Sequence, residues 1–359
     1  MPPQIDFKTF PSTRYQGSKR KILKWLHDNF KTLEFETVLD GFGGTGSVSY
    51  LLKKMGKTVT YNDFLHFNSI SGKALIENPN VIVNEDDIDF VLDFEGLECP
   101  GFIAKTFSGY YYTDEENQWL DNVIAKINQL HGITEPETEY KRAICFHALF
   151  QACLRKRPFN LYHRKNLNLR LNEVERNFGN KTTWEQDFES EFRKFVVEIN
   201  TSVFDSGAQC LSLNESIFEI ENEGYDLVYL DPPYVSGNGS NETNDYLKCY
   251  HFLEGLVDYE NWANRIDYDS KNLRFKKEYN PFDHDNILNS LDLIFNRFKE
   301  STIVLSYKIG GTPSVEQLKD LMSNYNRNLR VVSKHYKYAL NKQNGNAKHN
   351  REILLIAER

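Results

Sequence analysis

A short apolar segment that stops at two consecutive prolines limits what this chain can fold into. Residues 225–230, Tyr-Asp-Leu-Val-Tyr-Leu, have the length and composition of a buried strand. Pro232 and Pro233 cannot continue that strand, because proline has no backbone N–H to donate to a neighbouring strand. The sequence therefore predicts a strand whose carboxyl end carries Asp231, two rigid prolines and Tyr234.

These four residues suit the recognition of a planar amino group. The carboxylate of Asp231 can accept one N–H hydrogen bond and the carbonyl of Pro232 can accept another. The ring of Tyr234 offers a face on which a heteroaromatic ring can stack. In open α/β sheets, ligands bind at the carboxyl ends of the strands. Alternatively, the two prolines only form a turn, and the rest of the chain has to decide between these interpretations.

A glycine-rich loop near the N-terminus predicts a nucleotide-type binding site. Residues 35–40 have a strand pattern, residues 41–46 read Gly-Phe-Gly-Gly-Thr-Gly, and a helical pattern follows until Gly56. The glycines permit a tight turn and close approach of the backbone to a ligand. The loop is not a triphosphate-binding loop, because no Gly-Lys-Ser/Thr follows. Asp40 at the strand end can hold a cationic or hydroxylated ligand group, or the segment is only a structural turn.

Two further segments contain candidate ligand-binding residues. Asp63 follows a second strand pattern at residues 58–61, where an acid commonly binds ribose hydroxyls or caps the next helix. Near the N-terminus, basic residues surround Gly17 and Ser18 just before a helical pattern. We expect this segment to be either a loop that contacts a ligand through Lys19 or a solvated basic start of a helix.

The alternation of strands and helices stops between residues 80 and 205 and resumes with a strand pattern at residues 208–213. Residues 113–116 form a capping box that predicts the start of an amphipathic helix. A second helix is expected after Pro136, and a third between residues 184 and 200. The sequence thus predicts a mainly helical insert in an α/β protein.

The insert contains the strongest local concentration of positive charge. Residues 154–170 include six Lys/Arg and no acid, in a protein of net charge −8. Arg and Lys neutralise phosphates, while Arg, Asn and Tyr can also read or stack bases. The alternative is a solvated basic loop. Residues 270–277 and the loop that holds Lys342 are further basic stretches.

The composition excludes several classes of protein. A chain of 359 residues with 40% hydrophobic content can form one large or two modest domains. No apolar run approaches the roughly 20 residues of a membrane span, and the N-terminus lacks the features of a signal peptide. The five cysteines are widely spaced and form no metal-ligand pattern, which favours a reducing cytoplasm. The negative net charge argues against a uniformly basic nucleic-acid binder but allows local basic patches.

The order of these motifs resembles that of the DNA adenine methyltransferases of the Dam-like (alpha) class, which use S-adenosylmethionine. Residues 15–19 are similar to the N-terminal methionine-moiety loop of that class, and residues 40–46 to its cofactor motif, commonly Asp-x-Phe-x-Gly-x-Gly. Residues 231–234 match its catalytic motif in full. The likeness covers essentially the whole chain. One position departs from the pattern: Asn214 stands where family members often have an acid that contacts the adenine of the cofactor.

The resemblance implies a Rossmann-like methyltransferase sheet, mostly parallel with a reversed last strand, and an inserted mainly helical target-recognition domain. Residues 1–80 and 205–359 are expected to form the catalytic domain, and residues 81–204 the insert. The implied reaction transfers a methyl group from S-adenosylmethionine to the 6-amino group of an adenine flipped out of double-stranded DNA. The implied setting is the cytoplasm of a bacterium or phage host, with the protein monomeric or dimeric and accompanied or not by a restriction endonuclease.

The resemblance and the basic run together assign expected roles to individual residues. The catalytic residues are Asp231, Pro232, Pro233 and Tyr234. The cofactor is expected to contact Tyr15, Gly17, Ser18, Lys19, Asp40, Phe42, Gly43, Gly44, Thr45, Gly46, Asp63, Asn214 and Asp231. DNA is expected to contact Arg155, Arg157, Tyr162, His163, Arg164, Lys165, Asn166, Arg170 and Lys342. No metal site is expected.

Two alternatives stay open. A methyltransferase acting on the N4 amino group of cytosine, or on RNA, needs the same amino-group acceptors, although cytosine enzymes tend to have Ser at the position of Asp231 and another motif order. A DNA-binding relative that has lost catalysis is the second alternative. The joint presence of Asp40, Asp231 and Tyr234 argues against it.

Overall fold

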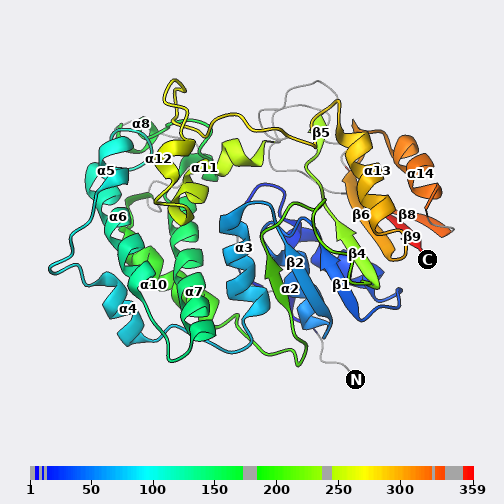
Figure 1. Cartoon of the computed structure of the whole chain (residues 1–359), viewed down its shortest axis with the longest axis horizontal. Coiled ribbons are helices and arrows are strands. Elements are labelled where there is room, and N and C mark those ends of the chain that lie inside the picture. Colours follow the sequence, from blue (N-terminus) through cyan, green and yellow to red (C-terminus); the bar gives the residue numbers. More distant parts are fainter. Residues whose placement is uncertain are drawn as a thin grey trace.

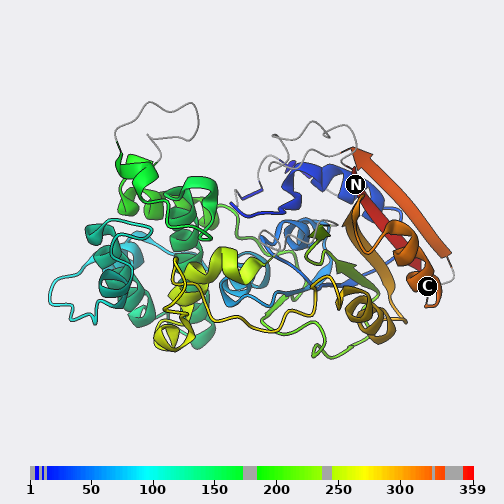
Figure 2. The same cartoon turned by 90° about the horizontal axis from the view of Figure 1, so that it is seen from above.

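The fold combines a part built on a β-sheet with a part made of helices, and the two lie side by side (Figures 1 and 2). The structure is a computed structural model that describes residues 5–7, 10–11, 14–172, 184–236, 245–325, 328–335 and 351–359. Within these residues, no helix has the length and apolar character needed to cross a lipid bilayer.

Seven strands form the main sheet, in the order β3-β2-β1-β4-β6-β9-β8. They are β1 (Thr37–Asp40), β2 (Thr58–Asn62), β3 (Leu211–Leu213), β4 (Leu227–Leu230), β6 (Thr302–Lys308), β8 (Asn328–His335) and β9 (Arg351–Glu358). The first five of these pair in parallel, whereas β9 runs antiparallel to both β6 and β8. The predicted mostly parallel sheet with a reversed last strand is therefore confirmed. A separate antiparallel pair joins β5 (Val235–Ser236) to β7 (Gly311–Thr312).

Helices cover both faces of this sheet. On β4, Leu227 and Tyr229 pack into one core cluster and Val228 and Leu230 into the other, as the two-residue period of a strand requires. The helices that supply the rest of these clusters on the sheet are α1 (Leu23–Phe30) and α2 (Ser47–Lys54) on one side, and α13 (Ile287–Arg297) and α14 (Val315–Ser323) on the other. Burial on both sides explains why this strand is a continuous apolar run.

The helical part starts after β2. Its helices are α3 (His66–Gly72), α4 (Glu85–Leu92), α5 (Phe102–Thr106), α6 (Asp114–Gln129), α7 (Glu135–Arg155), α8 (Asn168–Leu171), α10 (Phe188–Asn200), α11 (Tyr246–Val257) and α12 (Trp262–Arg265). Short 3-10 or π turns are η2 (Lys19–Ile22), η3 (Lys73–Glu77) and η4 (Pro158–Asn160). The predicted capping box forms at α6, where Thr113 and Glu116 each accept the other's backbone N–H.

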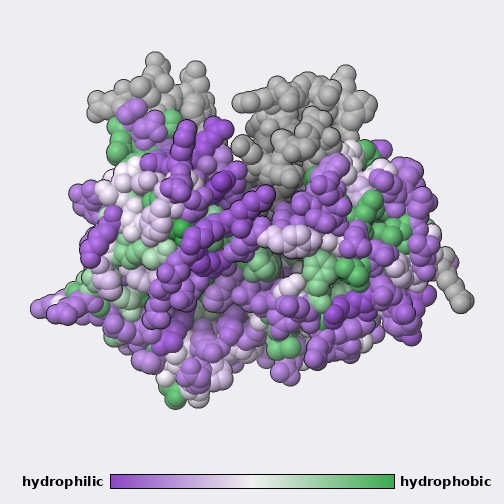
Figure 3. Space-filling model, turned by 45° about the horizontal axis from the view of Figure 1, so that its top comes forward, coloured by the Kyte–Doolittle hydropathy of each residue, from purple (hydrophilic) through white to green (hydrophobic). Residues whose placement is uncertain are grey.

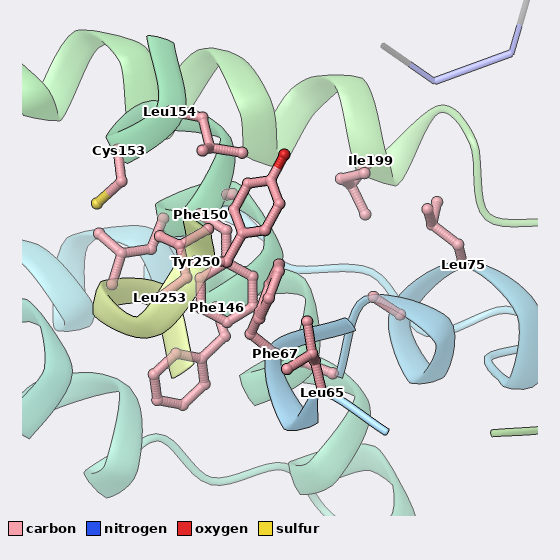
Figure 4. Packing of buried hydrophobic residues seen from close by; sticks show 14 of the residues in the cluster. Leu65, Phe67, Leu75, Phe146, Phe150, Cys153, Leu154, Ile199, Tyr250 and Leu253 are labelled. Carbon is pink, nitrogen blue, oxygen red and sulfur yellow. The ribbon is translucent and has the colours of Figure 1, made fainter. Parts of the chain in front are cut away.

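The helical part is wider than the insert expected from the sequence, which ended at residue 204. Figure 4 shows Tyr250 of α11 among Phe146 and Phe150 of α7 and Phe67 of α3. All four belong to one buried cluster, with ring centroids of Tyr250 and Phe67 5.7 Å apart. Residues that follow the Asp-Pro-Pro-Tyr motif therefore complete the helical core, and the chain then returns to α13 through residues 266–286, the yellow segment of Figures 1 and 2.

Candidate active site

A cavity of about 780 Å³ lies at the carboxyl ends of the parallel strands. Its wall combines the loops after β1, β2, β3 and β4 with residues 15–19, the start of α11 and part of the segment between α12 and α13. Asp40 is the last residue of β1, Asp63 and Asp231 directly follow β2 and β4, and all three line the cavity. The motifs that the sequence places far apart are thus brought together at one edge of the sheet, where ligands of such folds bind.

The glycine-rich loop forms the turn between β1 and α2 and needs its glycines for two reasons. A Cβ at Gly43 would lie 2.0 Å from the ring of Tyr61, so no other residue fits there. Gly44 and Gly46 have φ angles of +50° and +69°, which side chains other than glycine rarely adopt. The Tyr61 hydroxyl donates to the Gly44 carbonyl at 2.8 Å and fixes the turn. The backbone of this loop can therefore approach a ligand closely.

Asp40 offers a buried acceptor to the cavity. The side chain is 1% exposed, and its Oδ2 accepts a hydrogen bond from the Ser49 hydroxyl at 2.6 Å. Its Oδ1 has no hydrogen-bond partner among the described residues. Burial raises the pKa of Asp40 to about 7, against the opposing effect of the bond from Ser49. A ligand donor that reached Oδ1 would satisfy this oxygen and favour the ionised carboxylate.

Asp63 ties the glycine-rich loop to the start of the helical part. Its Oδ2 accepts the backbone N–H of Gly44 at 2.8 Å, and its Oδ1 accepts from the N–H of Leu65 at 2.9 Å and the Asn68 amide at 3.1 Å. Burial raises the pKa of Asp63, and these hydrogen bonds oppose the increase. The expectation that Asp63 caps the next helix is wrong, because the N-cap residue of α3 is Leu65 and no side chain caps that helix. Asp63 instead fixes the glycine-rich loop, while it also faces the cavity.

Lys19 lies against the predicted catalytic residues. Its Nζ is 2.9 Å from Asp231 Oδ1, 2.8 Å from Glu352 Oε1 and 2.7 Å from the Tyr234 hydroxyl. Burial opposes its charge, but attraction by the two carboxylates outweighs this and holds the pKa of Lys19 above its usual value. The sequence had grouped Lys19 with the cofactor contacts, whereas its ammonium group meets the Asp-Pro-Pro-Tyr motif.

The sequence analysis missed Glu352, the third charged group of this cluster. Glu352 is fully buried on β9 and accepts a hydrogen bond from Ser306 at 2.8 Å. The Tyr234 hydroxyl lies 2.7 Å from Asp231 Oδ1 and 2.9 Å from Glu352 Oε1, so it can donate to either. The only local signal is an acid directly before the apolar run of a strand that is buried on both sides.

Asp231 keeps one side open to the cavity. Its side chain is 18% exposed, and its contacts with Lys19 and Tyr234 both use Oδ1. Burial raises the pKa of the Asp231 carboxyl, Lys19 lowers it, and the nearby Glu352 charge adds to the increase. Among the described residues none bonds Oδ2, which leaves this oxygen as the acceptor for a ligand. Pro233 also lines the cavity, whereas Pro232 and Tyr234 do not contribute to its wall in this conformation.

Stacked tyrosines form another wall of the cavity. Tyr15 lies parallel to Tyr250 at 4.6 Å and to Tyr246 at 5.4 Å between ring centroids. Gly17 has a φ of +89°, and a Cβ there would lie 3.0 Å from the Tyr246 hydroxyl. The sequence predicted Tyr15 and Gly17 as site residues but not Tyr246, because nothing local distinguishes it from the other aromatic residues of α11. Ser18 and Thr45 also line the cavity and approach each other to 3.5 Å through their hydroxyls.

The side chain of Asn214 is held by the protein itself, and its predicted contact with the cofactor stays a prediction. Its amide nitrogen donates to the backbone carbonyls of Asp63 and Phe64 at 2.9 Å each, and the side chain does not belong to the cavity wall. The next residues, 215–218, line the cavity instead. Gly46 likewise stays outside the wall, because it serves as the N-cap residue of α2.

Three phenylalanines from separate loops, one of them Phe218, meet at the cavity. Phe218 stacks on Phe282 with ring centroids 5.8 Å apart, and Phe42 meets Phe282 edge-on at 5.2 Å. All three line the cavity. This aromatic group suits a flat heteroaromatic ligand, and of its members the sequence predicted only Phe42.

The basic run differs most from its prediction. Arg157 is 1% exposed, and its guanidinium donates to the carbonyls of Leu161, Arg164 and Lys165 at 3.0, 2.7 and 2.6 Å. It also lies over the ring of Tyr162, which is itself fully buried. Arg157 and Tyr162 therefore hold the loop together from inside, and the prediction that they contact DNA is corrected.

Other cations of the run are bound by acids from distant helices. Arg170 makes two hydrogen bonds to Glu116 at 2.7 and 2.8 Å, and Arg155 lies 2.8 Å from Glu191. The sequence could not show these pairs, because the acids lie dozens of residues away. Exposed members are Arg164 and Lys165; His163 and Asn166 are half-buried, and Lys342 lies outside the described residues.

Comparison with known proteins identifies relatives of the whole chain. The sequence model of one family, described as D12 class N6 adenine-specific DNA methyltransferase, matches residues 15–303. The Type II methyltransferase M2.HphI of Haemophilus parahaemolyticus is 28% identical over 357 residues, 98% of each chain. The Type II methyltransferase M.NlaIII of Neisseria lactamica is 22% identical over 96% of this chain and 99% of its own. The modification methylase StsI of Streptococcus sanguinis is 26% identical over 95% of this chain but 50% of its own.

Proposed function

The chain belongs to the D12 class N6 adenine-specific DNA methyltransferase family, and from this premise we propose how its cavity carries out methyl transfer. The methyl donor is S-adenosylmethionine, and the acceptor is the 6-amino group of an adenine flipped out of double-stranded DNA. One observation carries the proposal: Asp231 presents to the same cavity that the glycine-rich loop lines a carboxylate oxygen that has no partner among the described residues.

The cavity has three features that fit S-adenosylmethionine. Asp40 supplies a buried oxygen without a partner among the described residues, which suits a cationic or hydroxyl donor of the cofactor. The turn at Gly43 and Gly44 leaves no Cβ between the backbone and the ligand. The aromatic group around Phe282 suits the adenine ring. When bound in this cavity, the cofactor would supply an electrophilic methyl group.

Asp231 acts on the target amino group together with the Pro232 carbonyl, although Pro232 lies outside the cavity wall in this conformation and has to reach the base when DNA binds. The lone pair of an aromatic amine is delocalised into its ring, and two acceptors aligned with its N–H groups favour the pyramidal form that develops positive charge. Because this charge exists only in the transition state, the acceptors stabilise that state more than the bound substrate. Flipping the base costs a few kcal/mol, and stacking on an aromatic ring returns about 1–3 kcal/mol.

Lys19 and Glu352 position Asp231 and set the charge around it. Lys19 holds Oδ1 and so turns Oδ2 toward the cavity. A lysine beside a developing cation is unfavourable by itself, but Glu352 neutralises it. With Lys19 positive and both carboxylates ionised, the cluster keeps one net negative charge, which favours positive charge on the target nitrogen.

The finer identity rests on the order of motifs and on the relatives. The glycine-rich loop, the helical segment and the Asp-Pro-Pro-Tyr motif follow each other as in the Dam-like (alpha) class, so we assign the chain to that class. The helical part is the target-recognition domain, and Arg164 and Lys165 are the exposed cations of its basic run at residues 154–170. Because relatives are named Type II methyltransferases and a modification methylase, we assign the protein to a restriction–modification system.

Sequencing of DNA from expressing cells tests this function. Single-molecule sequencing of the genome of a methylase-deficient bacterium that expresses the chain is expected to show 6-methyladenine at every copy of one short sequence. Cells that express the Asp231→Ala variant provide the matched control. The proposal would be contradicted if the strain that expresses the wild-type chain, like the control strain, showed no new methylated motif.

A further inference from the structure

We propose that residues 271–277, between α12 and α13, form a second DNA-binding element that holds the strand carrying the target base at the opening of the cavity. The inference rests on the proposed function, since it takes DNA to be the substrate. The segment reads Lys-Asn-Leu-Arg-Phe-Lys-Lys, with four cations and no acid. It lies outside the helical segment to which the DNA contacts were first assigned.

The backbone of this segment is anchored to the helical part by its uncharged residues. Asn272 is buried, and its amide donates to the Tyr162 carbonyl at 3.0 Å. Phe275 is 4% exposed, with the guanidinium of Arg265 4.1 Å above its ring. The backbone N–H of Lys276 donates to the Arg265 carbonyl at 2.9 Å. The segment therefore presents its cations from a fixed backbone, so binding a phosphate requires little ordering of the chain.

These cations are not neutralised inside the protein. Lys271, Lys276 and Lys277 are exposed, and Arg274 is half-buried. Across the described parts of the chain, none of the four forms an ion pair with a carboxylate. The ammonium group of Lys276 donates to the neutral Asn264 carbonyl at 2.8 Å. The adjacent acid, Glu278, lies 3.8 Å from Arg265. Four positive charges are thus available to an anionic partner.

The position of the segment matches the path of a flipped strand. Residues 274–277 line the cavity together with Asp231 and Tyr246. Because Lys276 and Lys277 are also exposed, they lie where the cavity opens to solvent. Figures 1 and 2 show the segment passing from the helical part toward the sheet. Figure 3, in which the top of the view of Figure 1 comes forward, shows a mostly hydrophilic surface on this face of the molecule. A flipped base stays attached to its strand, so its flanking phosphates must meet this opening.

The test compares two double variants that change charge equally. Lys276→Glu with Lys277→Glu alters the segment, and Lys31→Glu with Lys299→Glu alters exposed lysines outside the cavity wall. Binding of a duplex that contains the methylation site is measured over a range of salt concentrations. The segment variant is expected to bind about tenfold or more weakly and to lose about one unit of the log–log salt slope per phosphate contact removed. The control variant is expected to keep the wild-type slope.

Cofactor binding and base flipping complete the design. Calorimetry is expected to give the wild-type affinity for S-adenosylmethionine, while 2-aminopurine at the target position is expected to fluoresce less with the segment variant. A salt slope equal to that of the control, or a loss of cofactor affinity without a change in slope, would overturn the inference. Lys276→Gln with Lys277→Gln gives the same comparison if the Glu variant does not fold. Wild-type protein that fails to bind or methylate DNA would overturn the proposed function first, and this inference with it.

Discussion

Two regions of this protein bury charged side chains, and the hydrogen-bonding atoms of these side chains are satisfied to different degrees. In the cavity, Lys19 lies between Asp231 and Glu352, yet Asp231 is still 18% exposed and keeps Oδ2 unpaired among the described residues. In the helical part, Arg157 is 1% exposed and donates to three backbone carbonyls. The comparison teaches that burial of a charge does not by itself indicate function. Function is indicated by a polar atom that faces a cavity and lacks a hydrogen-bond partner.

The largest effect is expected from Asp231→Ala, which removes the open member of the cavity cluster. Because the lost oxygen acts mainly in the transition state, kcat is expected to fall by about 1,000-fold or more. Affinity for S-adenosylmethionine, measured by calorimetry, is expected to stay within a few-fold of wild type. Loss of cofactor binding together with activity would mean that Asp231 holds the cofactor, and the contrast between the clusters would fail.

Arg157→Met tests the closed cluster. The change leaves three carbonyls without their donor, that of Leu161 buried and those of Arg164 and Lys165 partly buried, and each unpaired buried polar group costs about 1–3 kcal/mol. We expect the free energy of unfolding in urea to fall by about 3 kcal/mol or more. Lys165→Met, at an exposed neighbour, is expected to change it by only about 0.5 kcal/mol. Normal stability combined with lost DNA binding would show that Arg157 reaches DNA after all.

The outcome for these residues also shows what the sequence could and could not predict. Local patterns were sufficient for the strand, glycine-rich loop and helix around Asp40, and for the capping box at Thr113, because neighbouring residues determine such features. The reversed strand followed from the family resemblance. The inward direction of Arg157 could not be predicted, because its partners are backbone carbonyls that the loop brings together only after folding.

Other differences come from long-range packing. Glu352 reaches Lys19 only because β9 lies beside β6 in the sheet. α11 joins the helical core through its buried face although it follows the Asp-Pro-Pro-Tyr motif in sequence. Asn214 turns toward two backbone carbonyls, which no residue-type pattern specifies. In each case the partner is distant in the chain.

Glu352→Gln tests whether the charge of Glu352 contributes to catalysis by Asp231. Removing this charge leaves Lys19 and Asp231 neutral as a pair, so kcat is expected to fall about tenfold while KM for DNA changes little. The Glu352 charge contributes to the raised pKa of Asp231. The acid limb of the kcat–pH profile is therefore expected to move to lower pH. Glu358→Gln, on the same strand and 42% exposed, is the control. An unchanged profile with a reduced melting temperature would reduce Glu352 to a purely structural role.

Asp40 gives a smaller, pH-dependent effect. Because burial raises its pKa to about 7, the folded protein holds this proton more tightly than the unfolded chain. The stability of the free protein is therefore expected to fall as pH rises from about 4 to 7. Affinity for S-adenosylmethionine is expected to rise severalfold between about pH 6 and 8 as the carboxylate ionises. Asp40→Asn should flatten both curves, and curves that stay unchanged in this variant would assign them to another group.

The central claim is that the protein methylates the 6-amino group of adenine with the help of the open oxygen of Asp231. Analysis of the methylated product tests this claim most directly. Purified protein is incubated with double-stranded DNA and methyl-labelled S-adenosylmethionine, and the digested nucleosides are identified by mass spectrometry. The account predicts label in 6-methyladenine with the wild-type protein and none with Asp231→Ala. Label in 4-methylcytosine, or label only when RNA replaces DNA, would contradict it, and label in no nucleoside would indicate a DNA-binding relative without catalysis.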